Sequence, residues 1–233
     1  MDNQVVSKQR VAEHGEVYTG EREVNAMLDL VQPETERIDS RFLEPACGTG
    51  NFLAEVLRRK LRVVEARYGR SQLDWERNAV AAIASIYGID ILQDNVVECR
   101  RRLFEIFDAV YSARFKRKAG QPCRDAVRFI LEQNIVRGDA LTLQTVSAQP
   151  QPIVFSEWSF VKGSFLKRRE YAFHELLPQA KASGLSLFDE AEPLSDLGGD
   201  VFIPMPVREY PLIHFLKVAD AQNSSAEPDF ELR

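Results

Sequence analysis

The sequence predicts an α/β fold built on a doubly wound parallel sheet, and three observations predict it. Stretches with apolar residues at helical spacing alternate with short apolar stretches that fit buried strands. A glycine-containing turn, EPACGTG at residues 44–50, joins the first of these strands to a helix. The next two strands each carry an acidic residue at or just past their ends. This alternation is typical of a parallel sheet with helices packed on it.

Three elements are predicted before residue 70. A helix is predicted at residues 21–31, where the apolar residues recur on one face. The polar connector QPETERIDS separates it from the strand RFLEP at residues 41–45. After Gly50 the apolar residues again follow helical spacing, so a long helix follows the turn; its stripe is formed by Phe52, Leu53, Val56, Leu57, Leu61 and Val64.

The pattern then repeats twice. AVAAIAS at residues 79–85 predicts a helix that leads into the strand YGIDI at residues 87–91. Asn95 is a candidate N-cap for the next helix, whose core face carries Val96, Cys99, Leu103, Phe107 and Val110. A basic turn, a helix near residues 124–133 and a third strand within NIVRGDALTL (134–143) complete the series.

The rhythm is lost after Gln149. QPIVFSEWSF favours a strand and KRREYAFHELL favours a helix, but no regular alternation follows. We therefore predict a partial ligand-binding domain at residues 1–150, an irregular α+β extension at 151–220 and a disordered tail at 221–233.

Composition places the protein among ordinary globular chains: of 233 residues, 45% are hydrophobic and 28% charged. No apolar run approaches the roughly 18 residues that a membrane span needs, and the N-terminus lacks the apolar core of a signal peptide. The three cysteines, Cys47, Cys99 and Cys123, show neither a disulfide framework nor zinc-ligand spacing. We expect a cytoplasmic protein with no metal site.

The charge is unevenly distributed. The net charge is −5, but residues 186–233 hold ten acids and three bases, so the remainder is slightly basic. The bases are bunched in four runs: RRKLR (58–62), RRR (100–102), RFKRK (114–118) and KRR (167–169). Such runs suit a surface that faces phosphates, and they equally suit solvated helix faces.

The glycine-containing turn indicates a small-molecule site. Ligands of parallel sheets lie beyond the carboxyl ends of the strands, and Gly48 and Gly50 remove side chains where a ligand would approach the backbone. Asp90, at the end of the second strand, could accept hydrogen bonds from ribose hydroxyls. Asp139, just past the third strand, could bind the amino group of an adenine. A full G-x-G-x-x-G is absent because position 53 is Leu53, and no G-K-[ST] follows, which disfavours a dinucleotide and excludes a Walker loop.

FLEPACGTGNFL at 42–53, with VYTGEREVNAML at 17–28, resembles the S-adenosylmethionine-binding half of DNA adenine methyltransferases from restriction–modification systems. The resemblance covers roughly residues 15–143 and implies a Rossmann-like sheet of the class I methyltransferase type. It also implies roles for single residues. Tyr18 and Thr19 would close over the methionine end of the cofactor. The methionine and ribose would lie against Glu44, Ala46, Gly48 and Gly50, while Asp90 would hold the ribose and Asp139 the adenine.

The chain departs from that family in three ways. Gly20 stands where the family often has proline, and the segment from the turn to Asp90 is longer than usual. The catalytic Asn/Asp/Ser-Pro-Pro-aromatic tetrapeptide is missing, since the chain has no Pro-Pro pair; SEWS at 156–159 is its nearest counterpart by position. We therefore assign no catalytic residue and expect an incomplete sheet, in which the strand bearing Glu44 is an edge open to a partner.

The expected function is the cofactor-binding part of a site-specific DNA adenine methyltransferase in restriction–modification or phage defence. The chain would bind DNA as part of a complex with a second polypeptide, which carries the catalytic motif and the residues that recognise the target sequence. The alternatives are a non-catalytic scaffold that keeps the nucleotide pocket, a truncated fragment, and a methyltransferase that acts on RNA, protein or a small molecule.

Overall fold

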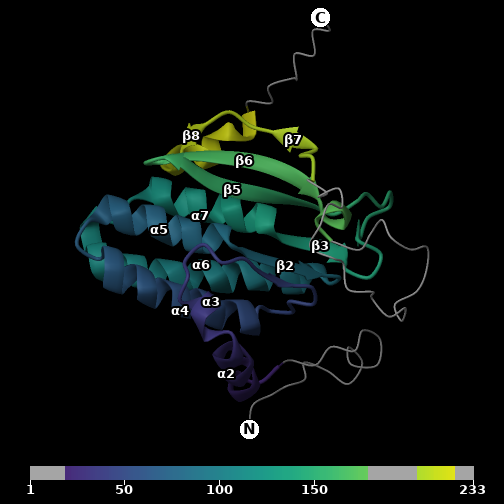
Figure 1. The fold of residues 1–233 in the computed structure, drawn as a ribbon, viewed down its shortest axis with the longest axis horizontal. Coiled ribbons are helices and arrows are strands. Elements are labelled where there is room, and N and C mark those ends of the chain that lie inside the picture. The colour runs from purple at the N-terminus through teal and green to yellow at the C-terminus, as the bar shows by residue number, and fades with distance from the viewer. Residues whose placement is uncertain (1–18, 178–203, 224–233) are drawn as a thin grey trace, which may run out of the picture.

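The computed structural model describes residues 19–177 and 204–223, which form two sheets and a set of long helices (Figure 1). The first sheet has the order β1-β2-β3-β4. Its parallel part consists of β1 (Phe42–Glu44), β2 (Ile86–Asp90) and β3 (Ile135–Asp139), and the short β4 (Gln144–Thr145) runs antiparallel to β3. The predicted α/β fold and its three parallel strands are confirmed.

Two helices stand between each pair of parallel strands. β1 is followed by α4 (Asn51–Tyr68) and α5 (Gln72–Ala84), and β2 by α6 (Gln93–Phe115) and α7 (Gln121–Asn134). The helices α4 and α6 have 18 and 23 residues, whereas β1 and β2 have 3 and 5. The helices therefore extend well past the strands, toward the left in Figure 1. The second helix, α5, accounts for the long segment between the glycine turn and Asp90.

The extended parts of the helices pack around an aromatic cluster. Trp75 is fully buried and stacks on Tyr111 with ring centroids 5.5 Å apart, while Phe107 and Phe115 complete the cluster. The polar atoms of the cluster are satisfied, as burial requires. Trp75 Nε1 donates to Glu65 (2.9 Å), and the Tyr111 hydroxyl accepts the backbone N–H of Gly120 (2.8 Å). The far end of the molecule is thus a helical body whose aromatic cluster belongs to the main core.

The two faces of the parallel sheet are covered differently. Gly88 faces α4, because a Cβ at this position would lie 3.0 Å from a methyl carbon of Leu53. Tyr87 and Ile89 point to the opposite face, where they form a second core with Ile153, Phe155 and Phe173. The predicted doubly wound sheet would have helices on both faces. In the structure helices cover one face, and residues beyond Gln149 cover the other.

These later residues form an antiparallel sheet. A hairpin of β5 (Val154–Lys162) and β6 (Phe165–Ala172) is joined by the short strands β7 (Arg208–Glu209) and β8 (Ile213–His214). The 3₁₀ helices η2 (Phe173–Leu176) and η3 (Phe215–Asn223) follow β6 and β8. The sheet lies on α5 and α7 in Figure 1. The strand predicted in QPIVFSEWSF is confirmed. The prediction of an irregular extension at residues 151–220 is wrong where these residues form the hairpin.

The helix predicted in KRREYAFHELL is also wrong, because most of this segment is β6. The cause is a charged pair on the inward face of the strand. Arg168 donates to Glu170 (2.5 Å), and its guanidinium lies over the rings of Trp158 and Tyr210 at 5.3 and 4.3 Å from their centroids. A strand that buries an Arg–Glu pair does not show the apolar–polar alternation by which strands are recognised.

The N-terminal part of the structure supports α4. The helix α2 (Glu21–Leu30) confirms the prediction at residues 21–31, and its buried Val24 and Leu28 belong to the main core. A single helical turn, α3 (Gln32–Thr35), lies within the connector that the sequence left without structure. The predicted tail falls mainly on residues 224–233, which lie outside the described residues.

One lysine is fully buried beneath β1. Lys60 Nζ donates to the carbonyl oxygens of Ile38 (3.0 Å) and Ser40 and to the hydroxyl of Ser85 (2.6 Å). These bonds tie α4 to the segments that lead into β1 and β2. Burial lowers the pKa of Lys60 to about 7.

The pKa of Lys60 predicts a pH-dependent stability. Between about pH 7 and about pH 10 the unfolded chain holds a proton on this lysine that the folded chain has lost, so the free energy of unfolding rises with pH. We expect a gain of roughly 2–3 kcal/mol between pH 6 and pH 9 by urea denaturation. Lys60→Met should remove this gain, whereas Lys162→Met, at an exposed position, should keep it. An equal pH dependence in both variants would contradict the prediction.

Candidate functional site

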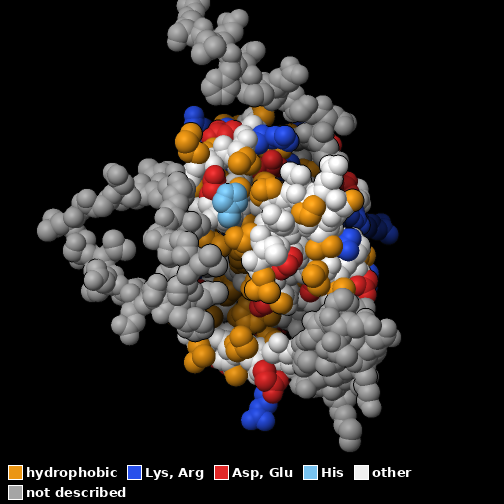
Figure 2. Space-filling model, turned by 90° about the vertical axis from the view of Figure 1, so that its right-hand side faces the viewer, with side chains coloured by type: hydrophobic (Ala, Val, Ile, Leu, Met, Phe, Trp, Pro, Cys, Tyr) orange, Lys and Arg blue, Asp and Glu red, His pale blue; other side chains and the backbone are white. Residues whose placement is uncertain are grey.

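A cleft of about 520 Å³ lies at the carboxyl ends of the three parallel strands. Six of the eight residues predicted from the sequence line it: Thr19, Glu44, Ala46, Gly48, Asp90 and Asp139. Tyr18 lies outside the described residues, and Gly50 is not part of the lining. Figure 2 looks onto the strand-end side of the molecule, where hydrophobic side chains gather around a hollow with acidic ones among them.

The glycine turn has the backbone that its sequence predicts. Gly48 and Gly50 have φ angles of 52° and 85°, which side chains rarely tolerate. The Cys47 N–H donates to the carbonyl of Ile89 (2.9 Å), so the turn continues the β1–β2 pairing. Gly50 caps α4, and a Cβ at this position would lie 2.7 Å from the sulfur of Cys99. Packing against α6, rather than approach of a ligand, accounts for the second glycine.

Asp90 joins the turn to the end of β2. One carboxylate oxygen accepts the backbone N–H of Gly48 (2.8 Å), and the other accepts the N–H of Leu92 (2.9 Å) and the side-chain amide of Asn95 (3.2 Å). Asn95 is therefore not the N-cap that the sequence predicts; α6 begins two residues earlier, at Gln93. A carboxylate accepts about four hydrogen bonds, so Asp90 keeps capacity for one further donor from the cleft.

The other two carboxyl groups of the cleft are less constrained. One oxygen of Asp139 accepts the N–H of Leu141 (2.8 Å), and the second oxygen has no partner among the described residues. Glu44 lies at the end of β1 and accepts the Ala46 N–H at 3.3 Å. Burial raises the pKa of Glu44, and the hydrogen bond from Ala46 opposes this rise.

Sequence reasoning missed the apolar residues of the cleft. Met27, Ile91 and Leu141 line it, with 50%, 44% and 95% of their surfaces exposed. Ile91 follows Asp90 directly, and Leu141 lies two residues after Asp139. An apolar residue just past each acidic strand end is a signal that could have identified both. Exposed apolar side chains at strand ends are suited to contact a flat ring.

A second missed feature attaches the upstream segment to the cleft. Asn51, the first residue of α4, donates its side-chain amide to the carbonyl of Thr19 (3.0 Å), and its oxygen accepts a bond from Arg102. Residue 19 is thereby held beside the glycine turn.

The cysteines of the site show no sign of activation. The hydrogen bond with Cys99 and burial both raise the pKa of the Cys47 thiol, which opposes a role as a nucleophile. Within the described part of the chain, no three His, Cys, Asp or Glu side chains gather as a metal site would require. Trp158, the residue that could have stacked on a base, packs against Phe129 and donates to Asn134 (2.9 Å).

Most of the basic residues are bound to other parts of the protein. In the first run Arg59 pairs with Asp29 (2.7 Å), and in the second Arg101 pairs with Glu98 (2.6 Å). In the KRR run Lys167 pairs with Glu209 (2.9 Å). For these three runs the structure favours internal ion pairs over a phosphate-facing surface. In the run at 114–118 Arg114 pairs with Glu65, whereas Lys116, Arg117 and Lys118 have no ion pair among the described residues.

Comparison with protein-family models, with curated proteins and with solved structures gave no match. None of the helices in the described ranges combines the length and apolarity needed to cross a bilayer.

The contact between Gly50 and Cys99 predicts a coupled pair of substitutions. Gly50→Ala places a methyl group against the sulfur and strains the backbone, so we expect a loss of about 2–4 kcal/mol in the free energy of unfolding. Cys99→Ala removes the sulfur that the new methyl group would meet. The loss of stability in the double variant should therefore be about 1–2 kcal/mol smaller than the sum of the losses in the two single variants. Urea denaturation of the four proteins measures this coupling. Additive losses would show that the contact is not what requires glycine.

Proposed function

We propose that the cleft binds S-adenosylmethionine and that the chain is the cofactor-binding part of a DNA adenine methyltransferase. One observation carries the proposal: Glu44, Asp90 and Asp139, from three different strands, line a single cleft with the glycine turn. The resemblance over residues 15–143 supplies the family. We also propose that the α/β fold of this chain is of the class I methyltransferase type.

The charge of the cleft separates the possible ligands. Its lining includes three carboxyl groups and, among the described residues, no lysine or arginine. A nucleotide with several phosphates would be repelled there, because like charges at short range disfavour binding. S-adenosylmethionine carries a positive sulfonium and a positive amino group, so the same carboxylates attract it.

The residues of the cleft fit the parts of this cofactor. Asp90 has capacity for a ribose hydroxyl, and the second oxygen of Asp139 can accept an adenine amino group. Ile91 and Leu141 offer apolar surface to the adenine ring, while Glu44 and Thr19 lie where the resemblance places the methionine end. The volume of about 520 Å³ lies within the range of small-molecule sites. When bound, the cofactor supplies a methyl group activated on sulfur.

A second polypeptide completes the proposal. The chain lacks the tetrapeptide that would hold the acceptor base, and β1 has a strand neighbour, β2, on one side only among the described residues. The N–H of Phe42 donates to the carbonyl of Ser85 on the β2 side (2.9 Å). Because successive residues of a strand direct their backbone groups to opposite sides, Leu43 offers its N–H and C=O to a partner. A parallel strand bound there would end beside Glu44.

Calorimetry with S-adenosylmethionine tests the cofactor proposal. Ala46 is exposed in the cleft, so Ala46→Phe fills the space and should weaken binding at least about tenfold without changing the fold. Ala113→Phe, an exposed position on α6, is the matched control and should bind as wild type does. Asp90→Ala should also lose binding. No heat of binding with wild type, or equal binding by the Ala46 variant, would refute the proposed site.

A transfer assay with radiolabelled methyl donor and duplex DNA tests the requirement for a partner. The isolated chain should transfer no label, and transfer should appear when the product of the neighbouring gene is added. Leu43→Pro removes the outward N–H and also fixes the φ angle at this position, and it should abolish this stimulation while cofactor binding persists. Leu43→Val keeps the N–H and should behave as wild type does. Transfer by the chain alone would contradict the requirement for a partner. Transfer to RNA or protein instead would show that DNA is not the acceptor.

A further inference from the structure

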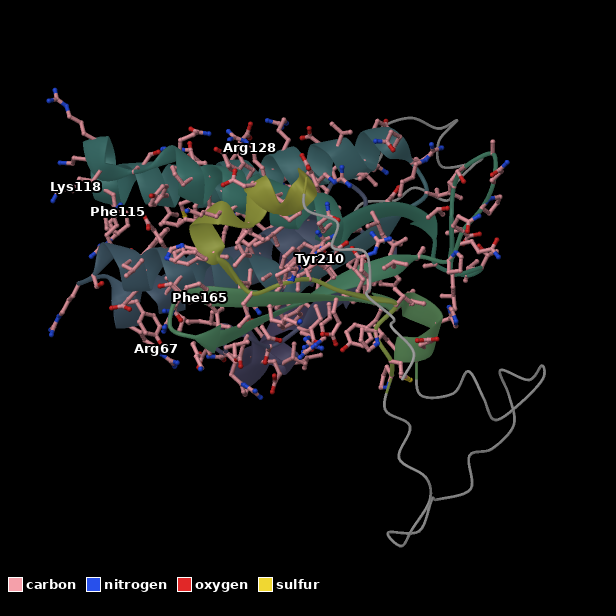
Figure 3. The ribbon with its side chains drawn as sticks, turned by 90° about the horizontal axis from the view of Figure 1, so that it is seen from above. Arg67, Phe115, Lys118, Arg128, Phe165 and Tyr210 are labelled. Carbon is pink, nitrogen blue, oxygen red and sulfur yellow. The ribbon has the colours of Figure 1, made fainter. Side chains whose placement is uncertain are left out.

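The end of the molecule opposite the cleft carries a group of exposed cations, which we call the basic end. It consists of Arg67 and Arg70 at the α4–α5 turn and Lys116, Arg117 and Lys118 in η1 (Lys116–Lys118), all of them exposed. Figure 3 shows Arg67 and Lys118 at the same end of the helical body, with Phe115 between them in the view. The two turns are brought together because α4 and α6 both end there.

These cations differ from most of the other basic residues that the structure describes. None of the five has an ion pair or a side-chain hydrogen bond within the described residues, whereas the exposed Arg62, Arg101 and Arg128 are all paired with carboxylates. Glu65 does not neutralise the group, because Arg114 and Trp75 already occupy its carboxylate. The positive charge of the basic end is therefore available to an external partner.

Helix dipoles do not explain the excess of charge. Cations at helix C-termini offset the negative end of the dipole, and α4 and α6 both end here. The helices α5 and α7, however, begin at the same place, so their positive ends cancel much of that field. Asp74 lies in the first turn of α5, where its negative charge offsets the positive end of that helix dipole. Five unpaired cations exceed what two helix ends require.

The shape of the basic end selects the partner. On the two turns Leu73 is the one large hydrophobic side chain among the described residues that is more than a third exposed. A protein partner would need a larger apolar centre, whereas a sugar–phosphate backbone needs only accessible cations. We propose that the basic end binds the phosphate backbone of duplex DNA, as a contact separate from the cleft. This goes beyond the proposed function and does not depend on cofactor binding.

Fluorescence anisotropy with a labelled DNA duplex of about 24 base pairs tests the proposal across a series of salt concentrations. The triple variant Arg67→Gln/Arg117→Gln/Lys118→Gln should bind at least about tenfold more weakly at low salt. Its slope of log affinity against log salt should fall by about 2–3, since each lost phosphate contact removes about 0.9. The control Arg62→Gln/Arg101→Gln/Arg128→Gln makes the same change in net charge at paired positions and should change the affinity less than about twofold.

Three results would overturn the proposal: no binding by wild type at about 25 mM salt, an equal loss in both triple variants, and equally tight binding of polyglutamate, which would indicate an acidic protein partner. Calorimetry with S-adenosylmethionine on the same variants separates the two proposals. The basic-end variant should bind the cofactor as wild type does, so loss of DNA binding with intact cofactor binding supports the inference. Failure of cofactor binding in wild type, with DNA binding retained, would affect only the proposed function.

Discussion

The hydrogen bond from the Gly48 N–H to the carboxylate of Asp90 is the interaction on which the site depends. It joins the turn after β1 to the end of β2, and the same carboxylate accepts the N–H at the start of the next loop. Because Asp90 is 8% exposed, these bonds form in a poorly solvated place, where they are strong and costly to lose. The turn, the strand end and the cleft therefore form one rigid unit rather than three loops.

The molecule separates its charges along its long helices. Glu44, Asp90 and Asp139 gather at the strand ends, while the five cations of the basic end, which have no ion pair within the described ranges, lie where α4 and α6 end. The length of these helices keeps the two groups apart. A net charge of −5 conceals this arrangement, because it sums over the whole chain, in which residues 186–233 alone hold ten acids and three bases. The proposed cofactor and the proposed DNA backbone each match the charge of the end at which they would bind.

The two sheets have different relations to the helices. The parallel sheet is small, and β1 has a described neighbour on one side only. Residues from the chain beyond Gln149 cover the face that carries Tyr87 and Ile89, through Ile153, Phe155 and Phe173. The antiparallel sheet is thus part of the support of the cleft rather than a separate appendage. This cover lies over the face of the sheet and adds no strand to the β1 edge among the described residues.

The sequence by itself determined the three parallel strands and most of the helix positions, because these follow from local spacing. Gly48, Asp90 and Asp139 follow from a glycine turn and from acidic residues at predicted strand ends, whereas Thr19, Glu44 and Ala46 came from the resemblance. Tertiary structure alone decided the rest. Gly50 is required by Cys99 on another helix, and Arg168 is tolerated inside β6 because Glu170 and aromatic rings surround it. Arg59 and Lys167 are paired with acids far away in the chain. Contacts between residues far apart in the chain leave no local pattern, so only the folded arrangement shows which charges are satisfied and which remain available.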